Sequence, residues 1–95
     1  MDNGRKVAEW TTYGGAVSVV VSCHYEGKDD PYTGRIPAYN AAEYTRADGL
    51  RGEHVFSALD DAAAIAVIEE RIAGGYYTPT GSRHAPGRVV EEQRA

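Results

Sequence analysis

Two adjacent glycines, Gly14 and Gly15, interrupt a run of β-branched and aromatic residues in RKVAEWTTYGGAVSVVVSCHYEG. A Gly-Gly pair tolerates the positive φ angles of the tight turns that join antiparallel strands. With these glycines at the turn, Trp10 faces Val19, and further out Lys6 faces Cys23. This register collects one apolar face, made of Ala8, Trp10, Val17, Val19, Val21, Cys23 and Tyr25. A slip of one residue would mix the two faces, so the pattern predicts a hairpin in this register.

A second hairpin is expected in AYNAAEYTRADGLRGEHVFS, because Asp48-Gly49 is another favoured turn pair. Centred there, the turn pairs Ala41 with Phe56 and Glu43 with His54. The alanine-rich residues 38–46 are poor strand formers, and a short helical turn is the competing interpretation.

The segment SALDDAAAIAVIEERIAGG, residues 57–75, has the pattern of a helix. Ser57 can cap its start, and Gly74-Gly75 supplies a left-handed stop. Two apolar sides follow from the helical period. One side holds Ala62, Ile65, Ile68 and Ile72 and should pack on the valine-lined face of the sheet. The other holds Ala63 and Val67, which are expected to be covered by the C-terminal segment, to form a self-association surface or to face water.

These elements predict an α+β domain, with a mainly antiparallel sheet of about four strands and one helix on one face (ββββα). Residues 1–78 form this single domain, and Tyr76 and Tyr77 are large enough to help cover its core. Residues 79–95 are polar, without hydrophobic period, and are expected to be a mobile tail. A single cysteine cannot form an internal disulfide, and no signal peptide or membrane span is evident. We therefore expect a cytoplasmic protein.

Chemistry-bearing patterns are sparse. The three histidines lack the spacing of a metal site, and Cys23 and His24 point to opposite faces of their strand, so neither a metal nor another cofactor is expected. On the polar face of the first hairpin, Glu9, His24 and Arg5 could imitate the acid-base site of a small nuclease. The chain has 14 acidic and 10 basic residues and a net charge of −4, so it lacks the basic groove that RNA requires. A non-enzymatic function is favoured, with the nuclease as the alternative.

The acidic balance disfavours both nucleic acid and anionic membranes as partners and suits a protein with a basic surface. The long loop over residues 26–37 offers the best cluster for such contact, made of Glu26, Asp29, Asp30, Tyr32 and Arg35. Alternatives are that this is a plain surface loop, or that the chain is a subunit of a structural homo-oligomer. Homodimerisation through the helix or a sheet edge is a secondary prediction.

In size, acidity and layout, the chain resembles the small phage-encoded inhibitors called anti-CRISPR proteins. The resemblance rests on these overall properties and on no residue motif, so it assigns no functional residue. It implies an inhibitor that blocks a CRISPR effector by occupying a basic nucleic-acid-binding surface, without catalysis.

Overall fold

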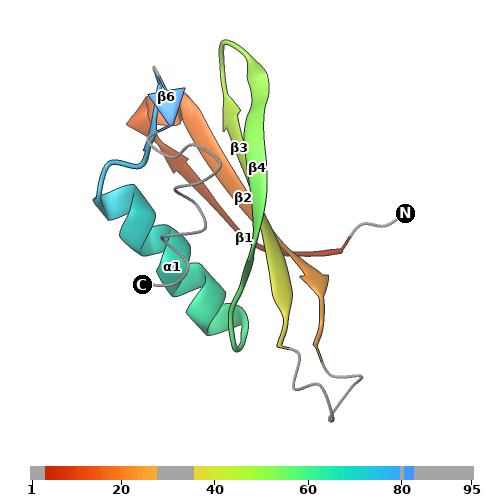
Figure 1. Ribbon diagram of the computed structural model, residues 1–95. Coiled ribbons are helices and arrows are strands. Elements are labelled where there is room, and N and C mark those ends of the chain that lie inside the picture. Colours follow the sequence, from red (N-terminus) through yellow and green to blue (C-terminus); the bar gives the residue numbers. More distant parts are fainter. Residues whose placement is uncertain (1–3, 28–35, 80, 83–95) are drawn as a thin grey trace.

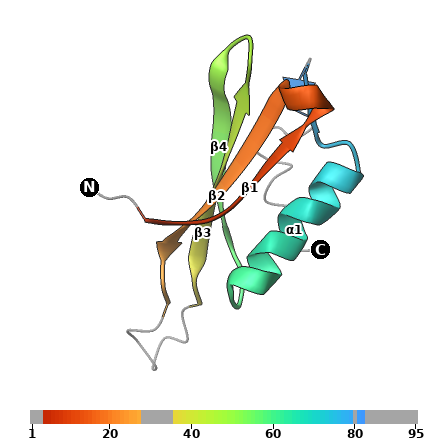
Figure 2. The same ribbon diagram turned by 180° about the vertical axis from the view of Figure 1, so that it is seen from behind.

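The computed structural model describes residues 4–27, 36–79 and 81–82. Four antiparallel strands form one sheet, in the order β1 (Arg5–Thr12), β2 (Val17–Tyr25), β3 (Ala38–Thr45), β4 (Gly49–Ser57). The helix α1 (Asp61–Ala73) lies on one side of this sheet, and the other side faces away from it (Figures 1 and 2). A single 3-10 turn, η1 (Tyr13–Gly15), and a two-stranded ribbon of β5 (Tyr77–Thr78) and β6 (Gly81–Ser82) complete the described elements. The predicted ββββα layout is confirmed, while the predicted tail lies outside the described residues except at its first positions.

The core forms between the helix and the valine-lined face of β2. Val17, Val19 and Val21 are fully buried there. Each buried valine contributes about 1.5–3 kcal/mol relative to exposure. Trp10 packs at the margin of this cluster, and Tyr76 and Tyr77 are buried in it as predicted.

The first hairpin keeps its predicted register near the turn, where Trp10 pairs with Val19, and loses it at the outer end. A bulge between Lys6 and Ala8 pairs Lys6 with Ser22 and Arg5 with Cys23. The extra residue of a bulge reverses the faces of the residues beyond it. The predicted pairing of Lys6 with Cys23 is therefore wrong, and Arg5 turns to the helix side of the sheet.

The predicted register of the second hairpin is wrong by two residues. Ala41 pairs with His54 rather than with Phe56. The turn holds three residues, 46–48, and Gly49 follows it at φ 74°. This is the pattern of a three-residue loop that ends in a left-handed glycine. Between residues 38–43 and 52–57, a shift of two residues keeps each side chain on its predicted face, because the strand period is two. Nearer the turn, a bulge between Glu43 and Tyr44 pairs Leu50 with Tyr44 and moves Leu50 to the face opposite to the predicted one. Residues 38–45 form a strand, so the competing helical turn is also wrong.

The helix begins three residues later than predicted, because Asp60 and not Ser57 is its N-cap. The Asp60 carboxylate accepts a hydrogen bond from the Ala63 backbone N–H at 2.9 Å. Ser57 instead ends β4. The rotation of the helix also differs from the prediction, since its buried residues are Ala64, Ile68 and Arg71.

The predicted self-association residues, Ala63 and Val67, are half-buried and pack against the core. Of the expected core side, Ala62 is exposed, and Ile65 and Ile72 are half-buried. Self-association through Ala63 and Val67 stays a prediction, with less free surface than the sequence suggests. In the described part of the chain, α1 is not a candidate for crossing a bilayer.

Candidate functional site

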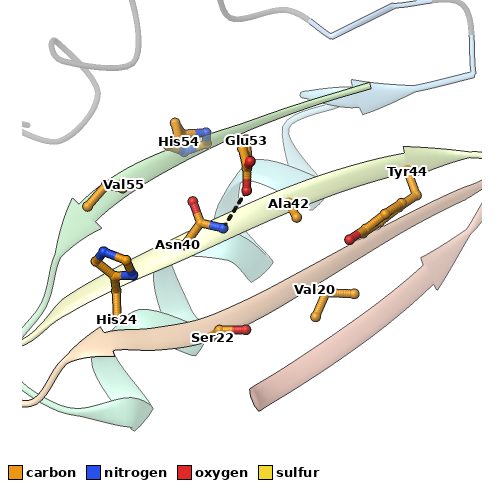
Figure 3. Close-up of a pocket in the computed structure, with 9 residues that line it drawn as sticks. All are labelled: Val20, Ser22, His24, Asn40, Ala42, Tyr44, Glu53, His54 and Val55. Atoms are coloured by element: carbon orange, nitrogen blue, oxygen red, sulfur yellow. Dashed lines mark hydrogen bonds between the residues drawn. The ribbon is translucent and has the colours of Figure 1, made fainter. Parts of the chain in front are cut away.

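The sheet face opposite the helix carries a shallow depression of about 580 Å³. Side chains of β2, β3 and β4 line it (Figure 3). We call this surface the open face and define it by Val20, Ser22, His24, Asn40, Ala42, Tyr44, Glu53 and Val55; His54 also borders the depression.

Strand alternation and register place these residues together. Inward residues of β2 are the core valines, so the residues between them point outward. Directly paired residues share a face. Across the strands, Ser22 pairs with Asn40, which pairs with Val55. A parallel row runs from Val20 through Ala42 to Glu53. The alternation and the register of the three strands therefore bring these side chains together on one face.

A hydrogen bond organises the middle of the depression. Asn40 Nδ2 donates to Glu53 Oε1 at 2.8 Å (Figure 3). In the described part of the chain, Glu53 Oε2 and Asn40 Oδ1 take no hydrogen bond. Both are acceptors and Glu53 is a carboxylate, so the centre of the depression offers negative potential.

Apolar surface surrounds this polar centre. Ala42 is buried and Val20 half-buried between the strands. Tyr44 keeps 39% of its surface exposed, and Val55 keeps 52%. His24 and Tyr44 stand at opposite ends of the depression (Figure 3). Exposed apolar side chains gathered on one face are typical of a contact surface.

The structure does not bring together the three residues of the nuclease alternative. Arg5 lies on the helix side, where its Nη1 donates to Asp61 Oδ2 at 2.8 Å. Glu9 is on the same side of the sheet as His24, but Lys6 Nζ contacts its Oε1 at 2.6 Å. Glu9 also pairs with Val20, four residues from His24, or about 13 Å along the strand. The bulge at the end of β1 is the reason that Arg5 left the predicted face.

Of the predicted loop cluster, only Glu26 belongs to the described residues. It is exposed, and its carboxylate accepts from Arg5 Nε at 3.3 Å. The other four members, Asp29, Asp30, Tyr32 and Arg35, lie outside the described residues. The sequence-based site candidates do not include Asn40, Tyr44, Glu53 or Val55. The signal that could have identified them is the presence of apolar residues, such as Tyr44 and Val55, among the polar residues of this face.

Arg5 forms ion pairs with Glu26, which follows β2, and with Asp61, the first residue of α1. Asp61 accepts from Arg5 and from the Tyr39 hydroxyl, at 2.8 Å in each case. These two donors, Arg5 first, hold the pKa of Asp61 below its usual range. Burial, and then the bond to Asp61, raises the pKa of Tyr39. The cluster therefore keeps Asp61 charged and Tyr39 neutral, and acts as a structural clasp.

Cys23 lies beside this clasp and is buried. Burial, followed by the charge of Glu26, raises the pKa of its thiol. A thiol is reactive as its thiolate, so this environment suppresses reactivity. Among the described residues, no three His, Cys, Asp or Glu side chains are grouped so that they could hold a metal ion.

A second polar cluster lies on the helix side of β4. Arg51 Nη2 pairs with Glu43 Oε2 at 2.8 Å, and the same guanidinium donates to the backbone carbonyls of Thr78 and Pro79. Glu43 is only 3% exposed. Arg51 therefore fastens the segment after the helix to the edge strand of the sheet.

Arg71, in the last turn of α1, is also inside and only 5% exposed. Its guanidinium bonds to the His54 ring and lies 5.6 Å from the centre of the Phe56 ring and 5.7 Å from that of Tyr76. Aromatic faces attract a guanidinium and make its burial tolerable.

Comparison of the chain with protein families, with curated proteins and with solved structures gives no match.

Proposed function

We propose that this chain is a non-enzymatic protein that binds another protein with a basic surface, and inhibits that partner by covering the surface. The open face is the proposed contact region. We prefer it to the loop over residues 26–37, where the described Glu26 carboxylate is already paired with Arg5.

The distribution of charge between inside and outside carries the proposal. Of the nine acidic side chains in the described part, only Glu43 is buried. Of the five basic ones there, Arg71 is buried and the side chain of Arg51 is only 18% exposed. The described exterior thus carries eight carboxylates and three exposed cations, and this part of the surface is more acidic than the composition indicates.

The three exposed cations are also engaged. Arg5 pairs with Glu26 and Asp61, Lys6 pairs with Glu9, and Arg46 donates to the Gly14 carbonyl at 2.9 Å. The described exterior therefore has carboxylates to offer and no cation outside its own contacts. Such a surface steers basic partners toward itself and repels phosphates.

The open face adds what charge alone lacks, namely exposed apolar contact area. Tyr44, Leu50 and Val55 are among the large apolar side chains that remain exposed. Leu50 pairs with Tyr44 and continues the same face toward the β3–β4 turn. Buried aromatic and aliphatic groups supply most of the binding energy of protein interfaces, and a polar rim gives specificity.

The resemblance to anti-CRISPR proteins gives the proposal its finer form. In that form, the partner is a CRISPR effector, and the covered surface is the basic channel that holds nucleic acid. An acidic exterior with a defined contact face fits such a competitor, because it meets the same positive charges as the nucleic-acid backbone.

Affinity capture from the source organism tests the proposal, with the tagged full chain in three forms: unchanged, Glu53→Lys and Glu69→Lys. Both substitutions reverse one exposed charge, the first on the open face and the second on the outer side of α1. We expect Glu53→Lys to reduce partner recovery at least tenfold and Glu69→Lys to change it less than about threefold. The partner's binding of DNA or RNA should fall when the unchanged chain is added.

Equal recovery with all three forms would show that the open face is the wrong surface. An RNA-cleaving activity that His24→Ala abolishes would show that the chain is an enzyme instead.

A further inference from the structure

We infer that the depression on the open face is a receptor for one basic side chain of the partner, with an arginine guanidinium as the preferred ligand. The preference for a guanidinium follows from the residues that line the depression. That this guanidinium belongs to a partner protein rests on the proposed function.

The centre of the depression presents a carboxylate and an amide oxygen. Asn40 Nδ2 uses one of its two N–H groups to donate to Glu53 Oε1, and in the described part of the chain Asn40 Oδ1 and Glu53 Oε2 accept no hydrogen bond. Arginine carries five N–H donors in a planar fork and no acceptor, so it complements the Glu53 carboxylate and can also donate to the Asn40 carbonyl oxygen. A carboxylate ligand would meet repulsion here, and a neutral ligand would leave the charge of Glu53 without a partner.

The bond from Asn40 also fixes the carboxylate in place. Asn40 is half-buried in the interior strand β3, whereas Glu53 is exposed on the edge strand β4. A carboxylate held by a neighbouring side chain loses less freedom on binding than a free one. Asn40 is thus a positioning residue for the charged group.

The apolar lining suits the rest of an arginine side chain. Val20 and Ala42 provide a floor on which its methylene groups can pack. Tyr44 stands at one end of this floor, with its ring available to a cation (Figure 3). A cation over an exposed aromatic ring gains about 0.5–1 kcal/mol. The volume of about 580 Å³ lies in the range of sites that hold small ligands.

The test uses the full ¹⁵N-labelled chain and two short peptides at low salt, acetyl-Gly-Arg-Gly-amide and its citrulline counterpart. Citrulline keeps the shape of arginine and removes the charge. We expect the arginine peptide to bind with a dissociation constant on the order of 1 mM. Its amide shifts should centre on Asn40, Ala42 and Glu53. The citrulline peptide should bind about tenfold more weakly.

Two matched variants locate the charge. Glu53→Gln should weaken the arginine peptide about tenfold, and Glu69→Gln should leave it unchanged, while the dispersion of each spectrum shows that the variant is folded. Equal binding of both peptides, or shifts centred on α1, overturns the inference. Concentration-dependent shifts of the same amides without peptide would show that a second copy occupies the site, and would also overturn it.

The two proposals fail separately. If Glu53→Lys abolishes capture but the arginine peptide does not bind, the proposed function stands without this receptor. If the peptide binds as expected but no basic partner is captured, the receptor stands and the proposed function fails.

Discussion

Replacement of Glu43 by Gln tests how much of the stability depends on the buried ion pair with Arg51. The substitution keeps the size of the side chain and removes its charge. Glu43 is 3% exposed, and the side chain of Arg51 is 18% exposed. The variant therefore leaves a largely buried guanidinium without a counter-charge.

Breaking a buried pair by removing one partner costs about 3–5 kcal/mol. We expect the lower end, about 3 kcal/mol, because Arg51 is not fully buried and keeps the carbonyls of Thr78 and Pro79. A chain of this length has a total stability of about 5–14 kcal/mol. The loss is thus a large fraction of the whole.

Urea unfolding followed by the fluorescence of Trp10, which packs beside the core, measures the change. With an m-value of about 1.5 kcal/mol/M, the midpoint should fall by about 2 M. The control is Glu9→Gln, which breaks the Lys6–Glu9 pair. That pair is shorter, 2.6 Å against 2.8 Å, but its side chains are 61% and 42% exposed. Exposed pairs are worth about 0–1 kcal/mol.

The double variant Glu43→Gln with Arg51→Met completes the cycle. It should cost at least about 1.5 kcal/mol less than the sum of the two single variants, since it leaves no uncompensated charge. If Glu43→Gln costs no more than Glu9→Gln, burial does not govern the strength of this pair and the reasoning is refuted.

Two further predictions concern the clasp and the helix start. Because burial and Asp61 raise the pKa of Tyr39, the folded state resists its ionisation, and this contribution to stability is present below about pH 10 and lost as the pH rises further. Tyr39→Phe should therefore cost about 1 kcal/mol at neutral pH and reduce the alkaline loss, as urea midpoints from pH 8 to 11 would show; an unchanged alkaline slope would contradict this. Asp60→Ala removes the acceptor of the Ala63 N–H and should cost about 1 kcal/mol in thermal or urea unfolding, whereas Ser57→Ala should cost less than half of that; the reverse order would contradict the assigned cap.

The faces of the sheet could be predicted from the sequence, because side-chain alternation fixes them independently of the exact turn. Trp10 and Val19 lie on the predicted side, and His24 lies on the other. In the second hairpin the register is wrong by two residues, and the faces of residues 38–43 and 52–57 are still correct. A bulge between Glu43 and Tyr44 reverses the predicted face of Leu50 near the turn.

Bulges and long-range contacts could not be predicted in the same way. The bulge after Lys6 has no local signature in the sequence, and it moved Arg5 to the helix side. Arg71 is held between the rings of Phe56, which precedes it by 15 residues, and Tyr76, which follows it by five. Contacts of this kind depend on how the helix docks on the sheet. The bond between Asn40 and Glu53 depends on the observed register of β3 and β4. The predicted register pairs Glu53 with Tyr44, so it could not indicate this bond at the centre of the candidate site.

The inward position of two arginines links stability to recognition. Arg51 and Arg71 stabilise the segment that follows the helix and at the same time remove positive charge from the exterior. In the proposed complex, charges on the outer helix face would act over about a Debye length, 8–10 Å, and would influence the association rate of a basic partner. Glu53, held against Asn40 beside apolar surface, would act at contact and influence the dissociation rate. A reversal of Glu69 should therefore slow association in a salt-dependent way, while a reversal of Glu53 should mainly speed dissociation. If both reversals changed only the association rate, the open face would contribute charge alone and no specific contact.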